Sequence, residues 1–435
     1  MLATILGVIV AFIVIIFLIR KKKTNFLLLP IFNEIKFGLF LILGALILGI
    51  FSLQTMQPIE IPKAIIQASI YSFKDHQIVT DTVELALLTT LIFILAKSMQ
   101  ETGSIKKLID SLRNFFSKGG TLGLIPAIYG LMPNPGGAIF SAPMIDEEGD
   151  KYNLDKNQKN LLNIWFRHIW EPIYPVFPAL ILICSATFAN INVFTLSLID
   201  MPVFIAALII GVVLLKKFVK KSTKQKIKPM KNYQGLIFIL PPIVPLFFYI
   251  ILQFFGFSQT RSFLIGIIFS IILLYFLTKI SVKEYLHIIK KSFTWRLIAA
   301  IFGIMIFREM FEATGANVDI ANLIGGFAVP ALAIIILIPF LLGFLIGYNL
   351  GGIALSYFLV EPFFSVTGLS ILGSTSIVFI STLTGYLISP IHLCNVLSSD
   401  YLKTDPTRIY KLFIPATLTL LVVQVGFVLV FSHFI

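Results

Sequence analysis

The sequence predicts an all-α polytopic membrane protein, made of two inverted-topology repeats of five transmembrane helices that each contain one re-entrant hairpin and one broken helix. Three observations lead to this fold class. Charged residues make up only 13% of the 435 residues, roughly half the fraction in soluble domains, while hydrophobic residues make up 57%. Prolines and glycines interrupt the apolar spans at matching places in the two halves. Lysine and arginine gather in alternate loops.

The matching interruptions include two short motifs that share an asparagine, two adjacent glycines and a serine. The first contains Asn134, Gly136, Gly137 and Ser141, and the second, at the same spacing, contains Asn349, Gly351, Gly352 and Ser356. Irregular backbone at membrane depth is tolerated only where it is buried in protein or lines a wet cavity. We therefore predict that the motifs are the tips of two equivalent re-entrant hairpins.

The first repeat is predicted to cover residues 1–215. Residues 2–19 are apolar and precede the basic run 20–23, whereas a cleavable signal peptide carries its positive charge before the apolar core. This order predicts a first span with the N-terminus outside. The remaining elements are spans at 37–53, 83–99 and 196–215, a mixed external segment at 54–81 and an amphipathic interfacial helix at 101–116.

A hairpin and a broken helix complete this repeat. The hairpin is expected at about 121–146, because each arm is shorter than the about 20 residues that a bilayer crossing needs. A charged cytoplasmic connector follows at 147–159. The segment 161–189 is too long for one simple crossing, and Glu171-Pro172-Ile173-Tyr174-Pro175 interrupts it, so a broken helix is predicted there.

A basic cytoplasmic linker at 216–234 leads to the second repeat, residues 235–435, which has the same order of elements. It comprises spans at 236–255, 263–277 and 295–310, a hairpin at about 330–364, a broken helix at about 372–397 interrupted by Ser389-Pro390-Ile391-His392, and a last span at 412–431. This layout places the C-terminus outside as well.

The distribution of basic residues supports this layout, since cytoplasmic loops carry an excess of lysine and arginine. Of the 34 basic residues, the layout leaves outside the cytoplasmic loops only Lys63, Lys74, Arg167, Arg261 and Arg308. The rival interpretation makes 330–347 a full span. That change would move Lys403, Arg408 and Lys411 to the outside, so the charge bias favours the hairpin.

Inverted repeats with discontinuous helices are the architecture of secondary transporters. Half-helices that begin at Gly137, Gly352, Pro172 and Pro390 would point unpaired N–H groups and positive dipole ends into the membrane interior. Such ends attract an anion. The backbone carbonyls near Asn134 and Asn349 are candidate ligands for a sodium ion.

A resemblance to known membrane proteins is concentrated in two segments, Pro133-Asn134-Pro135-Gly136-Gly137-Ala138 and Glu171-Pro172-Ile173-Tyr174-Pro175. The chain resembles the ion-transporter superfamily of divalent-anion/sodium symporters, citrate transporters and gluconate permeases. Within it, the chain looks most like an uncharacterised ten-span prokaryotic family, domain of unknown function 401. The resemblance implies two clamshell hairpins, two broken helices, a homodimer and elevator-type alternating access in the cytoplasmic membrane of a prokaryote. The dicarboxylate branch has Ser-Asn-Thr motifs at these positions, whereas here the tips carry Asn134 and Asn349 without that triplet.

Candidate substrate-binding residues lie at the tips and the breaks: Asn134, Pro135, Gly136, Gly137, Ala138, Ser141, Glu171, Pro172, Tyr174, Asn349, Gly351, Gly352, Ser356, Ser389, Pro390 and His392. Glu171 and His168 are the proton-coupling candidates, because an intramembrane ionisable group is a functional hypothesis by default. Alternatives stay open. The asparagines could cap the following arms, and the serines could bond back to their own helices. Glu171 could be a structural partner of His168 or Arg167, and His392 could be a satisfied core residue.

These observations predict a secondary active transporter of a small organic anion, a carboxylate or sugar acid, coupled to sodium or protons. A sodium/proton antiporter and, less favoured, a passive anion channel are the alternatives. A membrane enzyme would need a nucleophile–base pair or a metal-ligand cluster, and the spacing around His168 and His392 indicates neither. Cys184 and Cys394 are interpreted as small buried hydrophobic residues. No cofactor is expected, and the net charge of +13 lies in loops and does not indicate nucleic acid.

Overall fold

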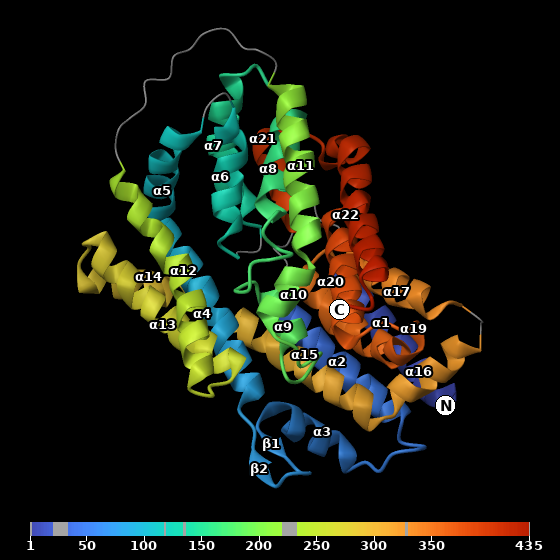
Figure 1. Ribbon diagram of the computed structural model, residues 1–435. Helices are drawn as coiled ribbons and strands as arrows, with labels where there is room; N and C mark the ends of the chain where they lie inside the picture. The colour runs from blue at the N-terminus through green and yellow to red at the C-terminus, as the bar shows by residue number, and fades with distance from the viewer. Residues whose placement is uncertain are drawn as a thin grey trace.

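The computed structural model describes residues 2–20, 34–116, 119–133, 136–219, 233–326 and 329–434. This described part is helical apart from one small β-hairpin (Figure 1). Six segments in it are long and apolar enough to cross a membrane: Asp81–Glu101, Met201–Phe218, Gln234–Phe254, Gln259–Thr278, Asn349–Thr367 and Pro406–Val430. The protein is therefore a multi-pass helical membrane protein. Asn134 and Pro135 of the first predicted tip and most of the predicted basic linker lie outside the described residues.

The first half of the chain contains these elements in order: α1 (Leu2–Arg20), α2 (Glu34–Phe51), α3 (Glu60–Ser69), β1 (Tyr71–Ser72), β2 (Gln77–Ile78), α4 (Asp81–Glu101), α5 (Ser104–Leu112), η1 (Arg113–Phe115), α6 (Gly120–Gly130), α7 (Ala138–Asp150), α8 (Lys156–His168), α9 (Pro178–Cys184), α10 (Val193–Ile199) and α11 (Met201–Phe218).

The second half contains η2 (Gln234–Ile239), α12 (Leu240–Phe254), α13 (Gln259–Thr278), α14 (Val282–Ser292), α15 (Trp295–Ala313), α16 (Ala316–Gly325), α17 (Ala331–Ile346), α18 (Asn349–Val360), η3 (Glu361–Phe363), α19 (Phe364–Thr367), α20 (Ile371–Leu387), α21 (Leu393–Leu402), η4 (Pro406–Ile409) and α22 (Tyr410–Val430).

Two features differ from the sequence-based expectations. The external segment 54–81 holds α3 and also the antiparallel pair β1–β2, in which Tyr71 faces Ile78. The strands are too short for a periodic signal, and the turn between them depends on Ser72, whose hydroxyl donates to Asp75 Oδ2 over 2.7 Å. The span expected at 196–215 is not one helix, because α10 and α11 meet at the buried Asp200.

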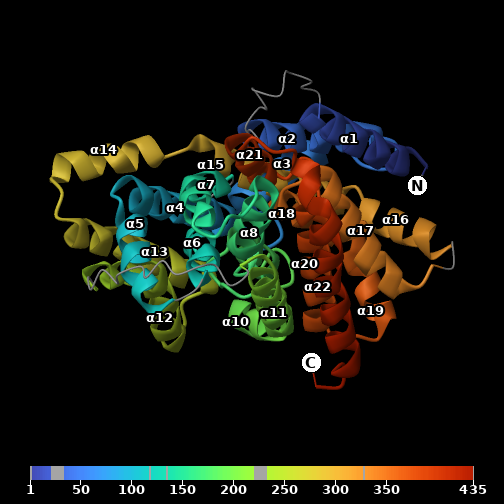
Figure 2. The same ribbon diagram turned by 90° about the horizontal axis from the view of Figure 1, so that it is seen from above.

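The short helices α6, α7, α8 and α21 lie together in the upper part of the molecule as drawn in Figure 1, and Figure 2 also shows them side by side. Helix α7 packs against α6, α8 and α21, and helix α18 packs against α17, α20 and α9. Glycines let α17 and α20 approach closely. A Cβ atom added at Gly385 would lie 2.0 Å from the Phe340 carbonyl oxygen, and one at Gly343 would lie 2.3 Å from that of Thr382.

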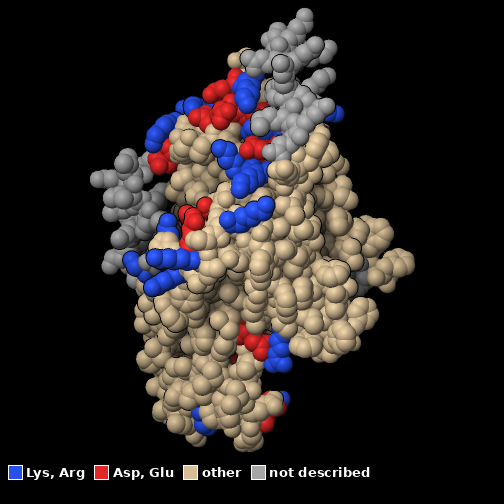
Figure 3. All heavy atoms as spheres, turned by 90° about the vertical axis from the view of Figure 1, so that its left-hand side faces the viewer, with Lys and Arg blue, Asp and Glu red and all other residues tan. Residues whose placement is uncertain are grey.

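Charged side chains gather at one end of the molecule, above a broad band of uncharged residues (Figure 3). The connector between α7 and α8 contributes several of the ion pairs. Lys159 Nζ lies 2.7 Å from Asp146 Oδ1 and 2.5 Å from Asp150 Oδ1, while Lys151 pairs with Glu148 at 2.9 Å. Asp155 then caps α8 by accepting from the N–H groups of the next turn. Ion pairs between residues close in the sequence therefore stabilise the connection from α7 to α8.

Candidate functional site

Two helix interruptions form the framework of the candidate site. Helix α8 ends at His168 and α9 begins at Pro178, while α20 ends at Leu387 and α21 begins at Leu393. Both gaps coincide with the predicted proline-containing segments. The expected restarts at Pro172 and Pro390 are wrong, however. The first gap contains Pro175 and reaches Pro178, and each proline disfavours helical backbone in the residue before it, so the helix resumes only at Pro178.

The tips also differ in detail from the prediction. Helix α7 begins next to Gly137, as expected, but α18 begins at Asn349, so Gly351 and Gly352 lie inside the helix. The chain changes direction before Asn349, because Gly347 takes a left-handed conformation with φ of 67° and Tyr348 is extended. Asn349 is therefore the first residue of the second helix of this pair.

The two interruptions bring five polar side chains together. His168 and Glu171 come from the first interruption, and Tyr386, His392 and Cys394 come from the second or its edges. The Tyr386 hydroxyl donates to Glu171 Oε1 over 2.9 Å, and the same oxygen lies 3.8 Å from His168 Nε2. The imidazole rings of His168 and His392 are 4.8 Å apart. All five residues are more than nine-tenths buried.

Each histidine in this cluster is held by its Nδ1 atom. His168 Nδ1 lies 2.6 Å from the Ile164 carbonyl oxygen, and His392 Nδ1 lies 3.1 Å from that of Leu387. One ring nitrogen from each histidine and the Cys394 sulfur lie within 4.8 Å of one another. The spacing in the sequence did not indicate this group, because its members come from both halves of the chain.

Cys394 is the residue that the sequence interpretation missed. The signal was the short spacing His392-x-Cys394 directly after the proline break. It carried little weight, because the third member, His168, comes from the other half of the chain. Tyr386 lies within an apolar run and gave no distinguishing pattern.

A second polar network joins α7, α8 and α21 beside this cluster. The Asn163 amide donates to the Ala138 carbonyl over 3.0 Å and to Ser398 Oγ over 2.8 Å, and its oxygen accepts from Ser141 at 2.6 Å. One turn away, Asn160 Nδ2 contacts Asn395 Oδ1 and Ser399 Oγ. Ser141 and Ala138 thus contact the framework of the first break.

At the second predicted tip, a buried polar side chain lacks hydrogen bonds among the described residues. Asn349 is 6% exposed, and within the described part of the chain neither atom of its side-chain amide has a hydrogen-bond partner. Ser356, by contrast, donates to the Ile353 carbonyl of its own helix over 3.5 Å. Ser389 donates to the Phe344 carbonyl over 2.6 Å and so ties the second break to the end of α17.

Other predicted residues lie away from the five-residue cluster or serve packing. The Tyr174 hydroxyl donates to the Pro242 carbonyl over 2.7 Å, which directs it to α12. A Cβ at Gly136 would lie 2.6 Å from Leu397 of α21, and one at Gly352 would lie 2.5 Å from Thr382 of α20. These glycines permit close helix contact.

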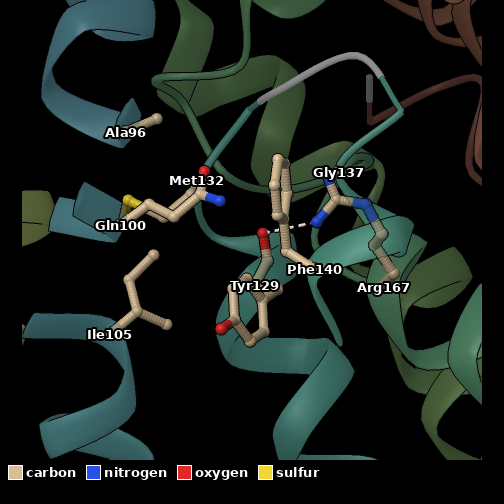
Figure 4. Close-up of a pocket in the computed structure, with 8 residues that line it drawn as sticks. All are labelled: Ala96, Gln100, Ile105, Tyr129, Met132, Gly137, Phe140 and Arg167. Atoms are coloured by element: carbon tan, nitrogen blue, oxygen red, sulfur yellow. Dashed lines mark hydrogen bonds between the residues drawn. The ribbon is translucent and has the colours of Figure 1, made fainter. Parts of the chain in front are cut away.

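A small pocket lies beside the first interruption (Figure 4). Its lining consists of Ala96, Gln100, Ile105, Tyr129, Met132, Gly137, Phe140 and Arg167. Figure 4 shows the Arg167 guanidinium reaching the Tyr129 backbone carbonyl, a 2.6 Å hydrogen bond from Nη1. Of the predicted tip residues, Gly137 lines this pocket. The pocket therefore places a buried cation next to the beginning of α7.

Asp200 is a further buried polar residue that the sequence analysis passed over. It is fully buried where α10 meets α11, and its Oδ1 accepts from Ser376 over 2.6 Å and from Gln424 Nε2 over 3.1 Å. It lies inside the span expected at 196–215, and its partners are far away in the chain. In the fold it connects α10 to α20 and α22.

The comparisons with known proteins identify a family. No curated protein matches the chain. A family model described as "Protein of unknown function (DUF401)" matches residues 4–430, nearly the whole chain, which confirms the resemblance to that family. The chain therefore belongs to the DUF401 family of proteins of unknown function.

Proposed function

We propose that the protein is a secondary active transporter of a small organic anion, a carboxylate or a sugar acid, driven by sodium or protons through elevator-type alternating access. The two helix pairs α6–α7 and α17–α18 are the re-entrant hairpins of this transporter. The broken helices are α8–α9 and α20–α21. Residues 1–215 and 235–435 form the inverted repeats.

One observation carries the proposal, and it is the matched packing of the two halves. Helix α7 packs on α8 of its own half and on α21 of the other half. Helix α18 packs on α20 of its own half and on α9 of the other half. Each hairpin therefore contacts the first part of its own broken helix and the second part of the opposite one. This exchange is what a two-fold inverted repeat produces.

A second correspondence supports the repeats. Gly103 and Gly315 have φ of 68° and 70°, and each directly precedes a short helix, α5 or α16. The preceding threonines, Thr102 and Thr314, both donate their hydroxyls to carbonyls of the helix before them. The same turn therefore leads from a long helix into a short one in both halves.

Anion binding is supported by the groups around the start of α7. The dipole of a helix is positive at this end. The N–H groups of Ile139 and Phe140 donate to the carbonyls of Gly136 and Gly137, so the support from α7 is its dipole. Arg167 lines the pocket that Gly137 also lines. An arginine presents a planar fork of donors that matches a carboxylate. The buried Asn349 amide supplies a further donor and acceptor at the second tip.

The proposal places the protein in the cytoplasmic membrane of a prokaryote, with both termini outside and the α7–α8 connector in the cytoplasm. The charge pattern supports this orientation, because the layout assigns the connector and the basic linker to the same side of the membrane. The proposed assembly is a homodimer, which the resemblance to elevator transporters implies.

A sodium/proton antiporter is the second candidate, and Glu171 favours it. The carboxylate is 7% exposed, and among the described residues its Oε2 has no hydrogen-bond partner. A buried carboxylate with one unpaired oxygen is a suitable proton carrier. In this case His168 and Glu171 would exchange protons and no organic substrate would be found.

Transport assays with purified protein in proteoliposomes test both candidates. Sodium and proton gradients are imposed separately, and uptake is measured for a panel of labelled carboxylates and sugar acids. Saturable, gradient-dependent uptake of one anion supports the symporter. Proton movement on a sodium gradient without any organic anion supports the antiporter. Vesicles that show neither activity contradict the proposal.

A further inference from the structure

We propose that His168, His392 and Cys394 form a binding site for a transition-metal ion of the zinc class. The site lies where the two helix interruptions meet, so both halves of the chain contribute ligands. It does not depend on the transport proposal, because a metal could bind here whether or not an anion is carried.

The distances fit coordination after a small contraction. The two ring nitrogens and the Cys394 sulfur lie within 4.8 Å of one another. Around tetrahedral zinc, with Zn–N of about 2.0 Å and Zn–S of about 2.3 Å, neighbouring ligand atoms are about 3.5 Å apart. Movements of roughly 1 Å at the three side chains therefore suffice. Cys394 and His392 lie at the start of α21, next to the irregular segment, where such movement is easiest.

The histidines are oriented as metal ligands usually are. A ligating imidazole typically donates its second N–H to a backbone carbonyl or carboxylate, which fixes the ring. His168 Nδ1 contacts the Ile164 carbonyl and His392 Nδ1 contacts the Leu387 carbonyl. Each ring therefore has Nε2 as its remaining ligand atom. His392 Nε2 is buried and has no hydrogen-bond partner in the described part of the chain.

The anionic groups of the cluster suit a divalent cation, and Arg167 is a further positive charge nearby. Cys394 binds as a thiolate and releases one proton, and the Glu171 carboxylate lies 3.8 Å from His168 Nε2. One thiolate and one carboxylate neutralise a divalent cation in this buried place, with both imidazoles neutral. Glu171 can also act as the fourth ligand. Glu171 Oε2 has no hydrogen-bond partner among the described residues, so it is available to a cation.

The donor set defines the class of ion. Imidazole and thiolate suit zinc and its neighbours in the first transition row. Sodium, magnesium and calcium prefer oxygen ligands. A sodium ion that drives transport would therefore bind elsewhere, which separates this site from the coupling ion of the proposed function.

Cobalt titration of the full chain in detergent tests the site, because Co²⁺ replaces zinc and reports its ligands by absorbance. The chelator-treated protein is titrated with Co²⁺, and Zn²⁺ is then added as competitor. We expect one Co²⁺ per chain, visible bands of tetrahedral cobalt and a thiolate-to-cobalt charge-transfer band. Zinc should abolish all of these bands. Absence of the charge-transfer band at saturating Co²⁺ would overturn the proposal.

The chain contains two cysteines, so a matched control is available. Cys184→Ser should keep the charge-transfer band, since Cys184 is also buried but lies outside the cluster. Cys394→Ser should lose it and bind Co²⁺ more than about 100-fold more weakly, because even outer-shell changes cost 10–100-fold. A retained band in Cys394→Ser, or a lost band in Cys184→Ser, contradicts the assignment.

A measurement on the wild-type protein tests the same assignment without depending on whether the Cys394 variant folds. X-ray absorption at the zinc edge of the zinc-loaded wild type should show one sulfur neighbour at about 2.3 Å with nitrogen or oxygen neighbours at about 2.0 Å. A shell made only of nitrogen and oxygen would exclude Cys394 and overturn the proposal.

Discussion

The imidazole rings of His168 and His392 lie 4.8 Å apart with an interplanar angle of 68°, although they follow different broken helices in opposite halves of the chain. Tyr386 completes the contact, with its ring 4.7 Å from that of His392 and its hydroxyl on Glu171. The two interruptions therefore form one polar unit inside an apolar protein.

Asn349→Ala should reduce anion uptake by about tenfold to a hundredfold with little loss of stability. Its amide makes no hydrogen bond within the described residues, so folding loses little when it is removed. A hydrogen bond to a charged ligand contributes about 1.5–3 kcal/mol, which sets the size of the effect. Initial rates in proteoliposomes measure it. Ser356→Ala is the control, since Ser356 bonds to its own helix and should transport normally. Equal rates in both variants would remove Asn349 from the site.

Glu171→Gln should flatten the pH dependence of transport while preserving the fold. The amide can still accept the hydrogen bond from Tyr386, but it cannot carry a proton. Initial uptake rates over a range of pH, compared with wild type, check this. Tyr386→Phe serves as the control, because it removes the hydrogen bond and keeps the carboxylate. A pH profile of Glu171→Gln that overlays that of wild type would assign Glu171 a structural role only.

Gly385→Ala should destabilise the protein by about 1–3 kcal/mol, the usual cost of overpacking. The new methyl group would lie 2.0 Å from the Phe340 carbonyl oxygen, so α17 and α20 would have to move apart. Gly426→Ala on α22 is the matched control, because in the described part of the chain no atom beyond its own stretch of helix lies within 4 Å of its Cβ position. Thermal unfolding in detergent compares them. Similar midpoints for the two variants would show that the contact between α17 and α20 is looser than described.

The ionisation of Asp146 should make the stability of the protein depend on pH. Burial opposes its ionisation, but hydrogen bonds from Lys159 and Lys156 outweigh burial and hold the pKa of the carboxyl below its ordinary value of 3.8. A lowered folded-state pKa contributes stability that is present above 3.8 and lost as pH falls through the lower value. Asp146→Asn should therefore unfold at a lower temperature than wild type near neutral pH.

The same pair of proteins should converge in acid, as the pH falls from 3.8 through the lowered pKa of Asp146 and the wild-type carboxyl becomes protonated. Thermal unfolding in detergent across this range measures the difference. Lys156→Gln is a milder control, because Lys156 is half exposed and surface pairs contribute little. A constant difference between Asp146→Asn and wild type at every pH would mean that the charge of Asp146 does not stabilise the connector.

Much of the helical organisation could be predicted from local patterns. Apolar length identified the long helices such as α4 and α13, and prolines identified both interruptions. What local patterns could not show was how far an interruption extends. The gap after His168 continues to Pro178 because of successive prolines, and α18 begins at Asn349 because Gly347 already reverses the chain.

The cluster at the interruptions was only partly predictable. Glu171 and His392 stood out as ionisable groups in apolar surroundings, and the structure brings both to one place. Cys394 and Tyr386 did not, since their significance arises from contacts between the two halves. Asp200 was overlooked for the same reason, as its partners Ser376 and Gln424 lie far away in the chain.

The amide contacts between α8 and α21 have a consequence for biogenesis. Asn160 and Asn163 find their partners in Asn395, Ser398 and Ser399, which the ribosome delivers near the end of synthesis. Until then these amides must be shielded from lipid by water, by the translocation machinery or by one another. The N-terminal half can therefore be inserted early, but it matures only when the last helices arrive.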